Sequence, residues 1–271
     1  MSNALRLLAV HAHPDDESSK GAATVARYRA EGIEVLVVSC TGGEAGSILN
    51  ENYDSDVSDM GAVRRAEMAN AAAILDIQHR WLGYIDSGMD EPLAEDCFAR
   101  VPLEESSAAL AEIIREYRPH VVTTYDENGG YPHPDHIRTH EVTMAACTAA
   151  AEEWQVSKVY FHHTFSRSRV VALHEAMQAS GLESAYEEWL KDWEPEKDVF
   201  RRVTTRVECS DFFETRDAAL RAHATQVDPQ GAWFAVPREI ERVVWPTEDY
   251  ELAFSTIEAV LPESDLFAGL R

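Results

Sequence analysis

The chain has 271 residues, 45% of them hydrophobic, which suffices for one large domain or for a domain with an appendage. Its formal net charge of −24 and pI near 4.7 argue against nucleic acid and anionic membrane surfaces as partners, because both require a cationic face. No run approaches the roughly 20 apolar residues that a membrane-spanning helix needs. A cleaved signal would remove the motif that follows the first apolar run, so we expect a cytoplasmic protein.

Apolar runs alternate with helical segments from residue 1 to about 165, which predicts a Rossmann-like α/β fold with a mostly parallel sheet flanked by helices. The expected strands are residues 5–10, 33–39, 79–85, 120–125 and 157–163. The expected helices are residues 18–31, 62–75, 103–117 and 136–151. Residues 1–165 would form the catalytic core.

Beyond residue 165 the alternation weakens, and two helices are expected at 169–181 and 212–225, with a turn at 189–195. No repeat or Gly/Ser linker separates this part, so residues 166–271 are expected to form an α-rich extension that packs on the core and completes the substrate pocket. The cysteines show no CxxC pair, which favours four reduced thiols over a disulfide or a thiolate metal site.

The first chemical motif, HAHPDDE at residues 11–17, directly follows the first apolar run. Residues two apart on a strand face the same way, so His11 and His13 project together. One carboxylate could simply cap the next helix. Three carboxylates beside two histidines exceed that need. Of the adjacent pair Asp15 and Asp16, one can bind a cation while the other moves a proton.

The second motif, YPHPDH at residues 131–136, follows the expected strand at 120–125. Because ligands bind at the carboxyl ends of the strands in an open α/β sheet, the two motifs should meet there. Imidazoles with a carboxylate suit zinc or iron(II), and no cysteine lies near either motif, which favours a catalytic over a structural metal. The pattern predicts a metal-dependent hydrolase, with zinc as first choice.

Histidines outside the two motifs are expected to be ordinary surface or core residues: His79, His120, His140, His162, His163 and His174.

Together, HPDDE at 13–17 and HPDH at 133–136 resemble the LmbE-like (PIG-L) family of zinc-dependent N-deacetylases, whose substrates are amides on glucosamine. The similarity also covers residues 9–21, 124–136 and 218–229 and extends into the C-terminal tail. It is greatest to members that cleave the amide joining an S-conjugated cysteine to glucosaminyl-inositol in mycothiol conjugates. A sister activity removes acetate from N-acetylglucosaminyl-inositol.

This resemblance implies one zinc ion per subunit, with Fe²⁺ as an alternative, held by His13, Asp16 and His136. It also implies that Asp15 is the general base that takes the proton of the attacking water.

Three residues of the second motif would complete the catalytic set. By resemblance, His133 is an electrophilic or acid partner, which we expect to act as an imidazolium. Asp135 would orient a histidine, and the Tyr131 hydroxyl would bond the reacting carbonyl.

Six further positions match substrate contacts or pocket residues of the family: Lys20, Glu44, Arg64, Asp86, His223 and Gln226. Ordinary alternatives remain for several of them. Arg64 on an Ala-rich helix could be a solvated residue, Asp86 a turn former and Lys20 an exposed lysine. His223 and Gln226 are expected on one helix.

The expected partner is therefore a small-molecule thiol conjugate, and the expected role is thiol-based detoxification. Two alternatives stay open: the sister deacetylation, and a non-catalytic sugar- or metal-binding protein. The second of these would be favoured by loss of Asp15 or of a metal ligand, and none is lost.

Overall fold

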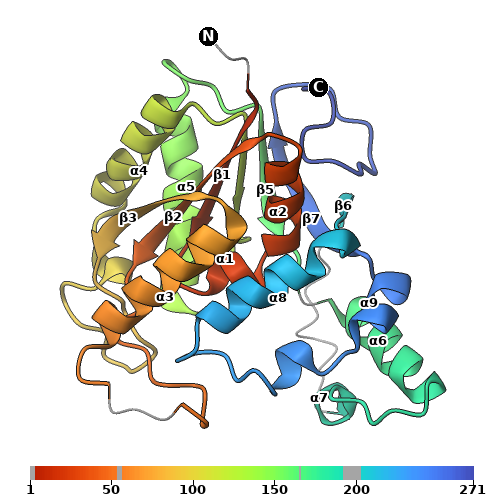
Figure 1. Ribbon diagram of the computed structural model, residues 1–271. Helices are drawn as coiled ribbons and strands as arrows, with labels where there is room; N and C mark the ends of the chain where they lie inside the picture. Colours follow the sequence, from red (N-terminus) through yellow and green to blue (C-terminus); the bar gives the residue numbers. More distant parts are fainter. Residues whose placement is uncertain (1–3, 54–56, 165, 192–202) are drawn as a thin grey trace.

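The computed structural model describes residues 4–53, 57–164, 166–191 and 203–271, and it is built on one seven-stranded sheet (Figure 1). The strand order is β3-β2-β1-β4-β5-β7-β6. The strands are β1 (Arg6–His11), β2 (Glu34–Thr41), β3 (Gln78–Tyr84), β4 (Val121–Thr124), β5 (Lys158–His162), β6 (Thr205–Glu208) and β7 (Thr247–Ser255). Strands β1 to β5 are parallel, as the alternating sequence pattern predicted.

The C-terminal part adds the two strands that were not expected. β7 pairs antiparallel with β5, and β6 pairs antiparallel with β7, so residues 166–271 extend the same sheet and are not purely helical. β6 has only four residues, which is too short for its alternation of buried and exposed positions to stand out from the sequence.

Helices cover both faces of the sheet. They are α1 (Asp16–Ser19), α2 (Ala22–Ala30), α3 (Met60–Leu75), α4 (Leu103–Tyr117), α5 (Pro134–Ala150), α6 (Arg167–Ala179), α7 (Glu187–Lys191), α8 (Phe213–Ala222) and α9 (Arg238–Val244), with 3₁₀ turns η1 (Phe98–Arg100), η3 (Ser210–Phe212) and η4 (Ala232–Phe234). In β1, Leu8 packs in the core cluster formed with α4 and α5, whereas Leu7 packs against α2. α8 lies across α2 and α3 (Figure 1).

The single helix expected over residues 18–31 is broken into α1 and α2. Lys20 is extended, and Gly21 has a φ of +88°, a conformation that favours glycine. A Cβ at Gly21 would lie 2.8 Å from Cε1 of His162, so close packing also requires glycine here.

The second C-terminal helix, expected over residues 212–225, ends at Ala222. Of the turn expected at 189–195, residues 189–191 instead belong to α7, and the remainder lies outside the described residues. All four cysteines are buried and free, as predicted: Cys40, Cys97, Cys147 and Cys209. Within the described residues, every helix is too short or too polar to cross a bilayer.

Candidate metal centre and catalytic site

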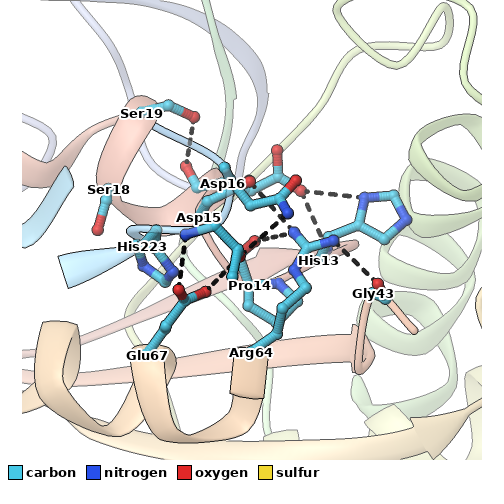
Figure 2. A network of polar contacts seen from close by, with 12 residues as sticks. His13, Pro14, Asp15, Asp16, Ser18, Ser19, Gly43, Arg64, Glu67 and His223 are labelled. Atoms are coloured by element: carbon cyan, nitrogen blue, oxygen red, sulfur yellow. Dashed lines mark hydrogen bonds and ion pairs between the residues drawn. The ribbon is translucent and has the colours of Figure 1, made fainter. Parts of the chain in front are cut away.

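The two sequence motifs meet where the strand order reverses. β1 pairs with β2 on one side and with β4 on the other, which is the switch point where open α/β sheets bind ligands. His13 and Asp16 follow β1, and His136 lies in the first turn of α5, after β4. Figure 2 shows His13, Asp15 and Asp16 gathered in the loop that leads into α1.

Three buried side chains could hold a metal ion. One donor atom each from His13, Asp16 and His136 lies within 4.8 Å of the other two. His13 Nδ1 is 3.6 Å and His136 Nε2 is 3.4 Å from the same oxygen, Asp16 Oδ2. Two imidazole nitrogens facing one carboxylate oxygen form a donor set that fits a divalent cation such as zinc or iron(II). The structure thus brings together the three predicted ligands.

His13 and His136 each use one ring nitrogen for a contact away from Asp16, which leaves the ring nitrogen that faces Asp16 available for a cation. His13 Nε2 lies 3.1 Å from Asp135 Oδ2, and His136 Nδ1 lies 2.9 Å from the carbonyl oxygen of Gly129. A carbonyl only accepts, so His136 Nδ1 carries the proton and Nε2 presents its lone pair. Asp135 likewise accepts a hydrogen bond from His13 Nε2, which leaves His13 Nδ1 facing Asp16. Carboxylates commonly bond metal-binding histidines from behind in this way.

A second group, His13, His133 and Asp135, also meets within 4.8 Å. In this group one histidine, His133, has already used the lone pair of its Nδ1. Asp135 accepts hydrogen bonds from the backbone N–H and the hydroxyl of Ser87, and His133 Nδ1 accepts one from the backbone N–H of Asp135. The group with Asp16 therefore fits a cation better.

Asp16 is held from two further sides. The Tyr125 hydroxyl donates to its Oδ2 at 2.7 Å, and the Lys20 ammonium donates to its Oδ1 at 2.6 Å. Burial alone would raise the pKa of Asp16, but Lys20 and His136 hold that pKa well below its usual range. Lys20, predicted to contact substrate, is thus paired with a candidate metal ligand.

Asp15 differs sharply from its neighbour Asp16. Its side chain is 24% exposed, compared with 3% for Asp16, and its Oδ2 accepts a hydrogen bond from Arg64 Nη2 at 3.1 Å. Burial raises the pKa of the Asp15 carboxyl, although Arg64 opposes the shift. A reachable carboxylate with a raised pKa beside a metal set has the properties of a general base.

Arg64 is buried and not solvated. It is 4% exposed, and besides Asp15 it donates to the carbonyl oxygens of Gly43 at 3.0 Å and Pro14 at 2.5 Å (Figure 2). Arg64 therefore holds the loop that carries Asp15, and its contact with substrate stays a prediction.

His133 and Tyr131 flank the candidate metal ligands. The Tyr131 side chain is 48% exposed, and its hydroxyl lies 3.5 Å from His136 Nε2. Burial, reinforced by His13 and His136, lowers the pKa of His133 to about 4. The imidazole is thus neutral near pH 7, which contradicts the expected imidazolium. Because its Nδ1 accepts the bond from Asp135, its proton is on Nε2.

Glu44 and Asp86 connect the loops after β2 and β3. Glu44 Oε1 accepts a hydrogen bond from the backbone N–H of Asp86 at 3.1 Å, and Asp86 Oδ2 accepts one from that of Ala45 at 3.2 Å. Asp86 Oδ1 also lies 3.5 Å from His13 Nε2. Asp86 is thus more than a turn former, because it abuts a candidate ligand.

His223 and Gln226 do not share a helix. His223 is the C-cap of α8, is buried, and places Nε2 2.7 Å from Glu17 Oε1. Gln226 Nε2 donates to the carbonyl oxygen of Ser47 at 3.1 Å. His223 thus joins the C-terminal part to α1, and Gln226 joins it to the loop after β2.

Sequence reasoning assigned no role to three supporting residues. Tyr125 binds Asp16, Ser87 binds Asp135, and Glu17 Oε2 accepts the backbone N–H of Asp15 at 2.9 Å. Tyr125 is the last residue of the strand expected before the second motif, which is a signal that could have identified it. Ser87 carries no comparable signal, because it reaches the site only through the fold.

Comparisons with known proteins show which family this chain is similar to. A family model described as PIG-L: GlcNAc-PI de-N-acetylase matches residues 8–147. The sequence is 54% identical to mycothiol S-conjugate amidase of Streptomyces coelicolor, over 100% of this chain and 99% of the relative. It is 39% identical to 1D-myo-inositol 2-acetamido-2-deoxy-alpha-D-glucopyranoside deacetylase of Thermobispora bispora, over 98% of each.

Among solved structures, a conserved protein from Thermus thermophilus, TT1542, shares the fold with a TM-score of 0.62 and 24% identity, over 94% of this chain and 97% of that one. The chain belongs to the PIG-L family, as its HPDDE and HPDH motifs predicted.

Proposed function

We propose that this protein is a metal-dependent amidase acting on mycothiol S-conjugates. Hydrolysis would release an N-acetylcysteine S-conjugate and glucosaminyl-inositol, in thiol-based detoxification. The observation that carries the proposal is a reachable carboxylate, Asp15, beside the buried set His13, Asp16 and His136, in a chain 54% identical over its whole length to an enzyme named for this activity.

The donor set of two imidazoles and one carboxylate supports Zn²⁺ as the cofactor, and Fe²⁺ also fits. A divalent cation bound there would lower the pKa of water and polarise the scissile carbonyl.

Proton transfer falls to Asp15. Its exposed carboxylate accepts a proton as water attacks the amide carbon, and then returns that proton to the leaving glucosamine nitrogen. Arg64 holds the carboxylate in place through its 3.1 Å contact. The raised pKa of Asp15 makes the carboxyl a stronger base than an ordinary aspartate and still lets it release the proton.

Negative charge that develops on the carbonyl oxygen needs donors. The Nε2–H of neutral His133 and the hydroxyl of Tyr131 are two protein donors next to the candidate ligands. One donor of this kind contributes about 2.7–4 kcal/mol to transition-state stabilisation.

An amine-release assay with two substrates tests the proposal. Zinc-loaded enzyme should cleave a bimane-labelled mycothiol adduct with a higher kcat/KM than N-acetylglucosaminyl-inositol. The reverse order would support the deacetylation for which the 39% identical relative is named. Metal-loaded enzyme that releases no amine from either substrate would reject hydrolysis in favour of a binding role.

A further inference from the structure

A cavity of about 280 Å³ lies on the β5–β7 side of the candidate metal centre. Its inner end is formed by Ser19, Gly21 and His162, and its outer walls come from α6, α7, α8 and α9, from the residues just before α7 and from the segment around η4. Aliphatic and aromatic side chains dominate these walls: Val170, Leu173, Tyr186, Trp189, Leu220 and Trp233.

The charged side chains of the cavity have hydrogen-bond partners within the protein. Arg169, Arg216 and Arg238 all donate to Glu241, at 2.9, 3.0 and 2.5 Å. Glu248 accepts a hydrogen bond from the backbone N–H of Thr24 at 2.8 Å. Because these charges are satisfied within the protein, the cavity favours an uncharged, largely apolar occupant.

His162 lines the inner end of the cavity and is 8% exposed. This histidine was expected to be an ordinary residue. Its Nε2 has no hydrogen-bond partner within the described chain, but the atom itself is inaccessible to solvent, so it offers no polar contact to an occupant of the cavity.

The cavity adjoins the segment that carries a candidate metal ligand. Ser19, at the inner end, donates through its hydroxyl to the carbonyl oxygen of Asp16 at 3.3 Å. β5 and β7 lie on one side of β1, whereas Glu44 and Asp86 follow β2 and β3 on the other. The cavity and these two acids therefore lie on opposite sides of the reaction centre.

We infer that this cavity binds the group attached to the cysteine sulfur of the substrate. The inference rests on the proposed function. A sugar–inositol half carries many hydroxyls, and a cavity with largely apolar walls does not satisfy them. An aromatic or aliphatic S-linked group matches these walls.

Two rim substitutions test the inference. Ala185 and Ala232 line the cavity and are exposed, so Ala185→Trp and Ala232→Trp would narrow its mouth without disturbing the core. We expect KM for the bimane adduct to rise about tenfold, because crowding a binding site typically weakens binding by about this factor. KM for the S-methyl adduct should stay within about twofold.

Ala149→Trp is the matched control, because Ala149 is exposed on α5 at a point roughly 20 Å along the helix from His136. It should change neither KM. Equal changes for both adducts in the rim variants, or no change in either, would overturn the inference.

A binding measurement separates this inference from the proposed function. Bimane emission should shift to the blue when the adduct binds to the Asp15→Asn protein, and the shift should be lost when Ala232→Trp is added. Wild-type enzyme that cleaves neither adduct rejects the proposed function. An emission shift unaffected by Ala232→Trp rejects the cavity.

Discussion

At the scale of single residues, Asp15 and Asp16 show how neighbouring carboxylates acquire different roles. Asp15 has a φ of +99°, which costs a residue other than glycine about 1–2 kcal/mol. Glu17 and Arg64 hold this conformation through the backbone N–H and the carboxylate of Asp15. The turn directs Asp15 outward, while Asp16 stays buried against the histidines.

Asp15→Asn should retain the metal and lose turnover, because the amide cannot accept the proton of water. We expect kcat to fall about 10²–10⁴-fold, the usual contribution of a general base. Metal content by atomic spectroscopy and steady-state kinetics provide the measurement. His13→Ala, the control, should lose both metal and activity, and a near-normal rate for Asp15→Asn would refute the assignment.

His133→Ala should lower kcat about 10²–10³-fold, because it removes one donor to the developing oxyanion. Since burial, reinforced by His13 and His136, lowers the pKa of His133 to about 4, its imidazole is almost entirely neutral between pH 6 and 8. The shape of the pH–rate profile between pH 6 and 8 should therefore be the same in variant and wild type. A basic limb present in the wild type and absent in the variant would show that His133 acts as an imidazolium.

At the scale of elements, the loop between β4 and α5 positions His136 through its glycines. Gly129 and Gly130 both have positive φ angles, of +72° and +78°. A Cβ on Gly129 would lie 2.6 Å from the Cβ of His136, whereas one on Gly130 would meet nothing within 4 Å.

Gly129→Ala should therefore displace His136 and weaken zinc binding by about 10–100-fold, comparable to the loss of a contact that orients a ligand. Gly130→Ala is the matched control, because it carries a similar backbone strain without the clash. Competition with a chromophoric chelator gives both affinities. Equal affinities for the two variants would mean that the loop does not position His136.

Local patterns in the sequence predicted the parallel strands and the gathering of His13, Asp16 and His136, because periodicity and strand-end motifs are short-range signals. Long-range contacts decide what those patterns missed. The break at Gly21 depends on His162, and the burial of Arg64 depends on the loop around Gly43. Strand β7 likewise pairs with β5, and the edge strand β6 pairs with β7, through contacts between residues that are far apart in the sequence.

At the scale of the whole molecule, acidic residues outnumber basic ones 48 to 24, yet the C-terminal helices are joined by a buried cluster of arginines around one carboxylate. Glu241 on α9 accepts hydrogen bonds from Arg169 on α6 and Arg216 on α8. Burial would raise the pKa of Glu241, but these guanidinium groups lower it to about 2.

A carboxyl whose pKa falls from 4.5 to about 2 on folding stabilises the protein above pH 4.5, and this stability is lost as the pH falls towards 2. Glu241→Gln should therefore lower the free energy of unfolding by about 3 kcal/mol at pH 7 and by about half of that or less at pH 3. Urea unfolding at both pH values provides the measurement. Glu239→Gln, an exposed position on the same helix, should have little effect at either pH. A loss for Glu241→Gln that is the same at both pH values would show that the arginine cluster does not stabilise the fold through the charge of Glu241.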